Sequence, residues 1–186
     1  MNRRNNMKLL CLFLIIIISS SCNQRKDIKE SHLEKVEIDS ILITYYPGSI
    51  ESNVAIKCEK IANIQAKHPK NDYSLLSEGI VEIIDTFIVE KIILDRIQPL
   101  IERKKTIAHY NEDARMYVTV KYTNNTKDNI CLGMEVSQGM FNGKAVFVEN
   151  ELVYLLRTYS GYYKWFDKDE LSYFTELQDS TFRKSH

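Results

Sequence analysis

Apolar and polar residues alternate along several segments of the chain, which is the pattern of β-strands that bury one face. The segment 114–122 shows this most clearly, because every second side chain from Met116 to Tyr122 is apolar or aromatic. Such alternation is typical of an antiparallel sheet with one face in solvent. The same reasoning predicts further strands at 36–46, 53–61, 79–84 and 130–136, and a hairpin formed by 137–141 and 144–148.

Turn-forming residues separate the predicted strands. Pro47-Gly48 is a strong turn signal and is expected to end the first strand. Asn142-Gly143 favours a two-residue hairpin turn, because both residues tolerate the positive φ that such turns need. The polar stretch 63–71 predicts a loop.

A helical spacing of apolar residues predicts the main core helix at about 86–102. Asp85 is expected to cap this helix, because its carboxylate can accept hydrogen bonds from the free amides of the first turn. Pro99 has no amide hydrogen and is expected to kink or end the helix near Gln98. The apolar positions are Ile88, Val89, Ile92, Ile93, Ile97, Leu100 and Ile101.

Two further helices are predicted near the C-terminus. Asn150 is expected to cap the first of them, "ELVYLLRTYS", and Gly161 is expected to end it. Asp167 and Glu170 have the spacing of a capping box. The helix that they begin carries Leu171, Phe174 and Leu177. The order of elements predicts an α+β fold, with an antiparallel sheet of about five or six strands and the helices grouped on one face.

The N-terminal segment has the features of a secretory signal. Arg3, Arg4 and Lys8 precede an apolar run from Leu9 to Ile18. As a helix this run spans about 15 Å, whereas a hydrocarbon core is about 30 Å thick. A basic leader, a short apolar run and small residues after it are the pattern of an export signal.

Ser19-Ser20-Ser21-Cys22 ends this segment and resembles the lipobox of small bacterial lipoproteins, although Ser19 stands where the usual pattern has an aliphatic residue. The resemblance implies that residues 1–21 are removed and that Cys22 becomes the acylated first residue. An ordinary cleaved signal that leaves Cys22 as a free thiol is the alternative. The resemblance covers about a tenth of the chain and implies anchoring, with the outer membrane as the expected location. Residues 22–37 are then a charged tether, 38–180 a single α+β domain and 181–186 a tail.

The charge of the mature chain argues against nucleic-acid binding. The full chain has 25 Lys and Arg residues and 25 Asp and Glu residues. Removing 1–21 removes Arg3, Arg4 and Lys8 and no acid, which leaves 22 basic and 25 acidic residues and a net charge of about −3. Nucleic-acid binding normally needs a basic surface. A protein or a glycan therefore stays open as the partner, beside the membrane.

Cys58 and Cys131 are the two cysteines left in the predicted folded domain. Outside the cytoplasm a disulfide is permitted. A bridge between them would stabilise the fold by about 4 kcal/mol in the chain-entropy model. Two separate buried thiols are the alternative.

The sequence offers few candidates for chemistry. None of the four histidines has another histidine or a cysteine at ligand spacing, so no metal or cofactor is predicted. Ser137 lies in "EVSQG", which lacks the first glycine of a nucleophile elbow. His109 stands near Glu112 and Asp113, and this group is the basis of one alternative, an envelope hydrolase. Asp167, Asp169 and Glu170 are read as a helix cap rather than a calcium site.

Tyr162, Tyr163, Trp165 and Phe166 form the richest aromatic stretch and are a candidate binding patch. The alternative is that these rings seal the end of the sheet. With no catalytic motif, the sequence favours a membrane-anchored, non-enzymatic binding or accessory lipoprotein of the bacterial cell envelope. The alternatives are the hydrolase and an inhibitor or immunity-type lipoprotein.

Overall fold

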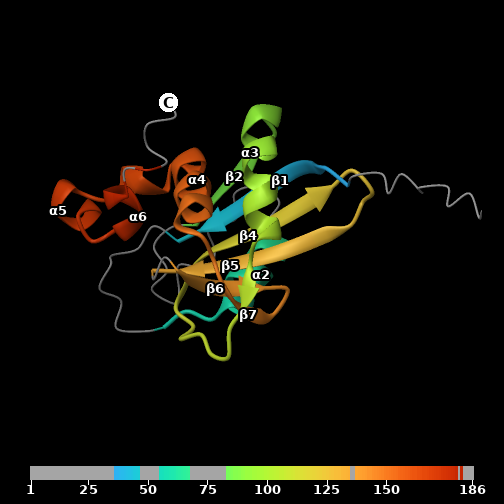
Figure 1. Cartoon of the computed structure of the whole chain (residues 1–186). Helices are drawn as coiled ribbons and strands as arrows, with labels where there is room; N and C mark the ends of the chain where they lie inside the picture. The colour runs from blue at the N-terminus through green and yellow to red at the C-terminus, as the bar shows by residue number, and fades with distance from the viewer. Residues whose placement is uncertain (1–35, 47–54, 68–82, 135–136, 180, 182–186) are drawn as a thin grey trace, which may run out of the picture. The chain divides into compact units, whose positions relative to one another are not determined.

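The structure, a computed structural model, describes residues 36–46, 55–67, 83–134, 137–179 and 181 (Figure 1). These residues belong to one compact unit that begins at Val36. The strands are β1 (Ile38–Tyr45), β2 (Ile84–Ile88), β3 (Lys105–Thr106), β4 (Ala114–Tyr122), β5 (Lys127–Gly133), β6 (Gln138–Phe141) and β7 (Lys144–Phe147). The helices are α2 (Cys58–Lys67), α3 (Lys91–Glu102), α4 (Asn150–Ser160), α5 (Lys168–Leu171) and α6 (Thr175–Gln178), with a 3-10 turn, η2 (Tyr162–Trp165).

The strands form one antiparallel sheet in the order β2-β1-β4-β5-β6-β7-β3. The predicted α+β class is therefore confirmed, although the described residues form seven strands rather than five or six. β4 has the predicted bounds. The β6–β7 hairpin turns at Asn142 and Gly143, whose φ angles of 47° and 77° are the positive values that the sequence predicts.

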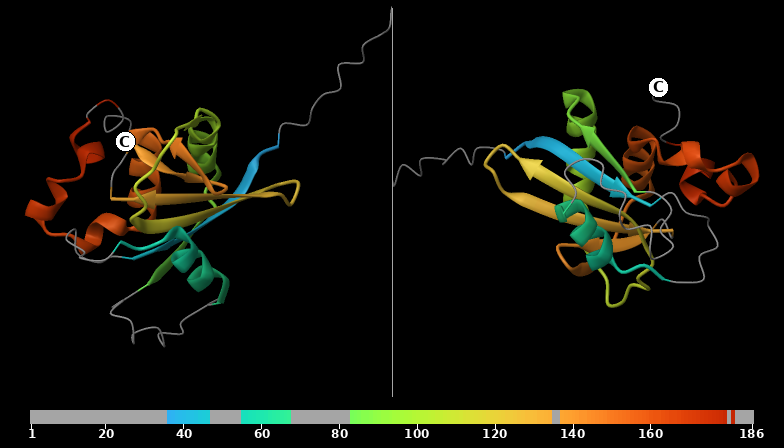
Figure 2. Two further views of the ribbon diagram at one scale, coloured as in Figure 1. Left: turned by 90° about the horizontal axis from the view of Figure 1, so that it is seen from below. Right: turned by 180° about the vertical axis from the view of Figure 1, so that it is seen from behind.

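Helices cover both faces of the sheet, which corrects the expectation that they share one face. Figure 2 shows α2 on the opposite side of the sheet from α3. As a result β4 is covered on both sides: Arg115 is 1% exposed and Thr119 is 8% exposed. Thr119 donates a hydrogen bond to Gln65 of α2 at 2.6 Å. Alternation indicates which residues share a face, but it does not tell whether a distant helix covers the polar one.

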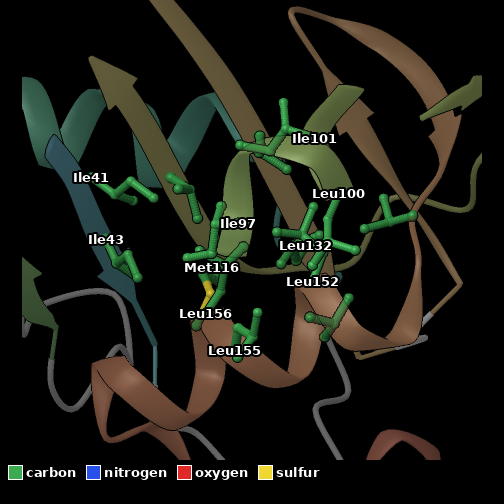
Figure 3. Packing of buried hydrophobic residues seen from close by; sticks show 14 of the residues in the cluster. Ile41, Ile43, Ile97, Leu100, Ile101, Met116, Leu132, Leu152, Leu155 and Leu156 are labelled. Carbon is green, nitrogen blue, oxygen red and sulfur yellow. The ribbon is translucent and has the colours of Figure 1, made fainter. Parts of the chain in front are cut away.

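The main core lies between the sheet and the helices α3 and α4 (Figure 3). Ile41 and Ile43 of β1 and Met116 of β4 are fully buried there. They meet Ile97 of α3 and Leu155 of α4, which are also fully buried. A large side chain buried in this way contributes about 1.5–3 kcal/mol to folding.

The predicted strand at 53–61 is wrong where it is described, because a helix begins at Cys58. Ile61 and Ile64 are buried one helical turn apart, and the helix continues through most of the predicted loop. The alternation that suggested a strand involves only three apolar residues. Of these, Ile56 is buried in the connection before the helix.

The main core helix begins at Lys91 rather than near 86, because Ile84–Ile88 forms strand β2. Most of the predicted strand at 79–84 lies outside the described residues. Asp85 caps no helix; it accepts a hydrogen bond from the Thr44 hydroxyl of β1. The helix also continues past Pro99 to Glu102. The lost backbone hydrogen bond costs about 3 kcal/mol, and burial of Leu100 and Ile101 after the proline offsets it.

Near the C-terminus, the residues predicted to begin or end helices are mostly confirmed, whereas the predicted length of the third helix is wrong. Gly161 ends α4 in the left-handed conformation, and Asp167 with Glu170 forms the predicted capping box. Asn150 is the first residue of α4 rather than its cap. The predicted third helix is instead two short helices, α5 and α6, with the buried Phe174 between them.

Candidate functional site

The aromatic stretch that the sequence singles out packs into a cluster, which we call the aromatic junction: Tyr45, Tyr162, Tyr163, Phe166 and Phe174. The Tyr162 ring lies 5.4 Å from that of Tyr45 and 5.0 Å from that of Phe166. Phe174 lies 4.9 Å from Phe166 in an edge-to-face arrangement. Edge-to-face pairs at such distances are favourable beyond the area that they bury. The junction therefore ties η2 and the C-terminal helices to the end of β1.

Gly161 creates the local geometry. Its φ of 77° ends α4 and allows η2 to begin at once. The tight turn directs Tyr162 inward, where it is completely buried, while Trp165 stays 46% exposed. The indole Nε1 of Trp165 donates to the Tyr45 hydroxyl at 3.2 Å. That hydroxyl donates to the Ser160 carbonyl at 3.1 Å.

Most of the four aromatic side chains of the predicted binding patch are not available on the surface. Tyr162 and Phe166 are buried, and Tyr163 is half-buried. Their rings pack as the alternative interpretation expects, sealing the end of the sheet. Trp165 is therefore the side chain of this stretch that is best placed to contact a ligand directly.

An open pocket of about 330 Å³ lies beside Trp165. It is lined by Tyr45, Ile84, Ser160, Gly161, Lys164 and Trp165. The exposed indole supplies an apolar surface and the Lys164 ammonium a positive charge. Such a pocket has the size of a small-ligand site, and its lining offers an apolar stacking surface and a positive charge.

A buried ion pair lies under the aromatic junction. Arg157 of α4 donates to Glu176 of α6, and both side chains are almost completely buried. Arg157 also donates to the Gly133 carbonyl at 2.6 Å, and the Tyr163 hydroxyl donates to Glu176 at 2.7 Å. Burial first, and then the Glu176 carboxylate, raise the pKa of Tyr163 far above its usual range. Because removal of either charge would leave the other in an apolar environment, the pair holds α6 against α4.

Cys58 and Cys131 lie together on the α2 side of the sheet. Their Cα atoms are 6.0 Å apart, within the usual range for a disulfide, and the structure joins their sulfurs. Cys58 is the first residue of α2 and Cys131 is in the middle of β5. The pair fixes the start of α2 to the sheet beside a small cluster with Ile56, Ile61 and Ala114.

The residues considered for a hydrolase have structural partners. The Glu112 carboxylate accepts a hydrogen bond from the Cys58 amide, and Asp113 accepts one from the Ile56 amide at 3.1 Å. Asp113 also pairs with Arg115 at 2.9 Å. Both carboxylates therefore position the segment that leads into α2. His109 is exposed in the loop before β4.

Arg115 is a buried cation on the face of β4 that the alternation of this strand predicts to be in solvent. It sits where the pairing of β4 with β5 shifts register. One of its nitrogens, Nη2, donates to Asp113, and the guanidinium lies 5.8 Å from the Tyr46 ring. Nε and Nη1 have no hydrogen-bond partner among the described residues. No local signal reveals this, because a polar residue in an alternating strand normally indicates solvent.

The described residues contain no cluster of three or more histidine, cysteine, aspartate or glutamate side chains able to hold a metal ion. Asp167 accepts hydrogen bonds from the amides of Asp169 and Glu170, as a cap does. Ser137 accepts a backbone bond from Val148 and lies at the start of the β6–β7 hairpin. A search of the same part of the chain finds no helix of the length and apolarity that a bilayer crossing requires.

No family model matches this chain, and neither a curated protein nor a solved structure shows significant similarity to it. The candidate site is therefore described by its own geometry.

Proposed function

We propose that this chain is a lipid-anchored, non-enzymatic binding or accessory protein of the bacterial cell envelope. The observation that carries the proposal is the pattern that ends in Ser19-Ser20-Ser21-Cys22 after a basic leader and a short apolar run. This part lies outside the described residues. In the proposal, Cys22 bears the lipid and the charged residues after it connect the lipid to the domain, with the outer membrane as the location.

The cysteine pair supports an extracytoplasmic location. Disulfides persist in oxidising compartments and are rare in the cytosol. Cys58 and Cys131 are far apart in sequence but adjacent in the fold, at a distance suited to a bridge. A disulfide between these two cysteines needs an oxidising compartment, and export would bring the chain into one.

Anchoring follows from the energetics of acyl chains. Each buried methylene contributes about 0.8 kcal/mol, so one chain binds a membrane weakly and two or three bind it almost permanently. The proposed activity is then to hold a binding surface near the bilayer. A surface of this kind needs exposed side chains, and the domain presents Trp165 beside the open pocket. A protein or a glycan is the proposed partner.

Mass spectrometry of the protein purified from its own membranes tests the proposal. We expect a mature chain that begins at Cys22 and carries two or three acyl chains. The matched variant Cys22→Ser should remain an unprocessed precursor without lipid. A mature chain that begins elsewhere, or that has an unmodified thiol at Cys22, would refute the anchor. Protease treatment of intact cells then shows whether the domain faces outward.

A further inference from the structure

β2 is an outer strand of the sheet that the described residues form. β1 pairs with one side of it, and no strand of the described residues pairs with the other. In an antiparallel strand, alternate residues direct both backbone groups to the same side. Two or three residues of β2 therefore present N–H and C=O groups that can receive another strand. The opposite outer strand, β3, has only two residues and offers much less.

Exposed apolar residues lie on β2 and shortly after it in the chain, and we call Phe87, Val89 and Ile92 the edge patch. Their exposed fractions are 60%, 62% and 82%. Phe87 and Val89 flank Ile88, which is buried in the main core, so both point away from that core. Natural edge strands are usually blunted by charge, proline or shortness. An edge that instead carries large exposed apolar side chains indicates a surface that is covered in function.

α3 follows the edge strand and also contacts the first described residues of the domain. β2 leads directly into α3, beside the start of β1 (Figure 2). The Lys91 ammonium of α3 pairs with Glu37 at 3.2 Å, just before β1. Gln98 donates to the Val36 carbonyl at 3.0 Å. These contacts hold Glu37 at the first turn of α3 and Val36, which is 38% exposed, about two turns further along the helix.

The rim of the edge patch is acidic. Lys91 is the cation next to Ile92 of the edge patch, and its ammonium is already paired with Glu37 and Asp95. A partner that covers the patch is therefore favoured if it brings positive charge. The exposed carboxylates of the rim are those of Glu37, Asp39, Asp85, Glu90 and Asp95.

We infer that β2 binds an extended segment of another protein, in which apolar and basic side chains alternate, as an eighth strand of the sheet. Backbone hydrogen bonds to the open edge supply affinity, and side chains of alternate residues supply specificity. The added strand places its apolar side chains on the face that carries Phe87 and Val89, and its basic side chains on the opposite face, which is the side of α3 and its exposed Asp95.

The same charges disfavour two other occupants. A symmetric pair of copies would set one acidic rim against the other, because a two-fold interface places like patches together. An anionic membrane surface would repel the rim for the same reason. The inference rests on the proposed binding role and names its partner class, but it does not depend on the lipid anchor. If no segment binds at β2, the mass-spectrometric test of the lipid on Cys22 is unaffected.

A defined peptide tests the edge directly. The probe is a peptide that alternates valine with lysine, added to the full-length protein in detergent. We expect it to slow hydrogen exchange of the β2 amides and to bind less tightly as salt is raised. A peptide that alternates valine with glutamate should not bind. Equal binding of the two peptides, protection confined to other strands, or no measurable binding would each overturn the inference.

Two variants connect binding to the edge patch. Phe87→Ser should weaken binding of the valine–lysine peptide about tenfold or more, because a large apolar contact at the centre of an interface is lost. Val89→Ser lies outside the strand and repeats the test if Phe87→Ser fails to fold. The matched control is Tyr173→Ser, since Tyr173 is 72% exposed on the link between α5 and α6. Equal affinities in the Phe87, Val89 and Tyr173 variants would place the contact elsewhere.

A photoreactive amino acid at position 87, in cells, identifies the natural occupant. We expect one major adduct whose mapped site lies in a segment of another protein with alternating apolar and basic residues. The same photoreactive group at position 173 should not give this adduct. Adducts to a second copy of the chain, to lipid, or to a segment without basic residues would refute the inference.

Discussion

Replacing Glu176 with alanine is the sharpest test of how the C-terminal helices are held. The carboxylate lies completely buried, pairs with Arg157 and accepts a hydrogen bond from the Tyr163 hydroxyl at 2.7 Å. The variant leaves the Arg157 guanidinium, itself 1% exposed, with backbone carbonyl partners in place of its counter-charge. Breaking a buried pair in this way costs about 3–5 kcal/mol. A loss of this size is a large fraction of the 5–15 kcal/mol of a typical domain.

Urea unfolding of the Glu176→Ala protein measures this cost. We expect the midpoint to fall with little change in slope, since the surface exposed on unfolding stays nearly the same. The double variant Arg157→Met with Glu176→Leu should recover most of the loss, because it removes both charges together. The matched control is Glu149→Ala, which breaks the more exposed pair with Arg103 and should cost about 1 kcal/mol or less. A Glu176→Ala loss no larger than that of the control would refute a desolvated pair.

Three further predictions concern the same domain. Reduction of Cys58 and Cys131, or Cys131→Ser, should lower the free energy of unfolding by about 4 kcal/mol, and an unchanged urea midpoint under reducing conditions would contradict the bridge. Because the pKa of Tyr163 is raised in the fold, its contribution to stability should be constant below about pH 10 and fall above it. Unfolding curves from pH 8 to 11 measure this, and Tyr163→Phe should flatten the decline. Tyr162→Ala should cost about 3–5 kcal/mol in a thermal melt, whereas Trp165→Ala should cost less than about 1 kcal/mol; equal losses would contradict the inward and outward placements.

The parts of the fold that sequence predicted well depend on local chemistry. The turn at Asn142 and Gly143 needs positive φ, and Gly161 ends α4 for the same reason. The capping box of Asp167 and Glu170 is also complete within four residues. Such features are decided by a few neighbouring residues, so the sequence around them is sufficient.

The wrong assignments share a dependence on distant contacts. Ile88 fits either the end of a strand or the first turn of a helix, and its pairing opposite Ile41 of β1 decides for the strand. Ile56 alternates like a strand residue, but the next residues form a helix that packs on β4 and β1. Period alone does not separate these cases, because the competing elements are short.

The candidate site shows the same division. The aromatic composition of 162–166 predicted either a binding patch or rings that seal the end of the sheet, and the structure shows Tyr162 and Phe166 packed in the core. The composition did not reveal that Tyr162 is buried and Trp165 exposed, which depends on the direction of the turn after Gly161. The Arg157–Glu176 pair was not predicted, because the two residues lie on different short helices. Exposure of Phe87 was also not predicted, since its segment was assigned to the core helix.

The position of β1 constrains the order in which this chain can fold. β1 is the first strand of the described residues, yet it lies inside the sheet between β2 and β4. It pairs first with Ile84–Ile88 and then with residues that end at Tyr122. A chain emerging from its N-terminus therefore has no stable sheet until about two thirds of its length is available. Pairing over such sequence separations is slow to form. A sheet that is completed this late leaves the chain unfolded through most of its synthesis, which is the state that the proposed export would need.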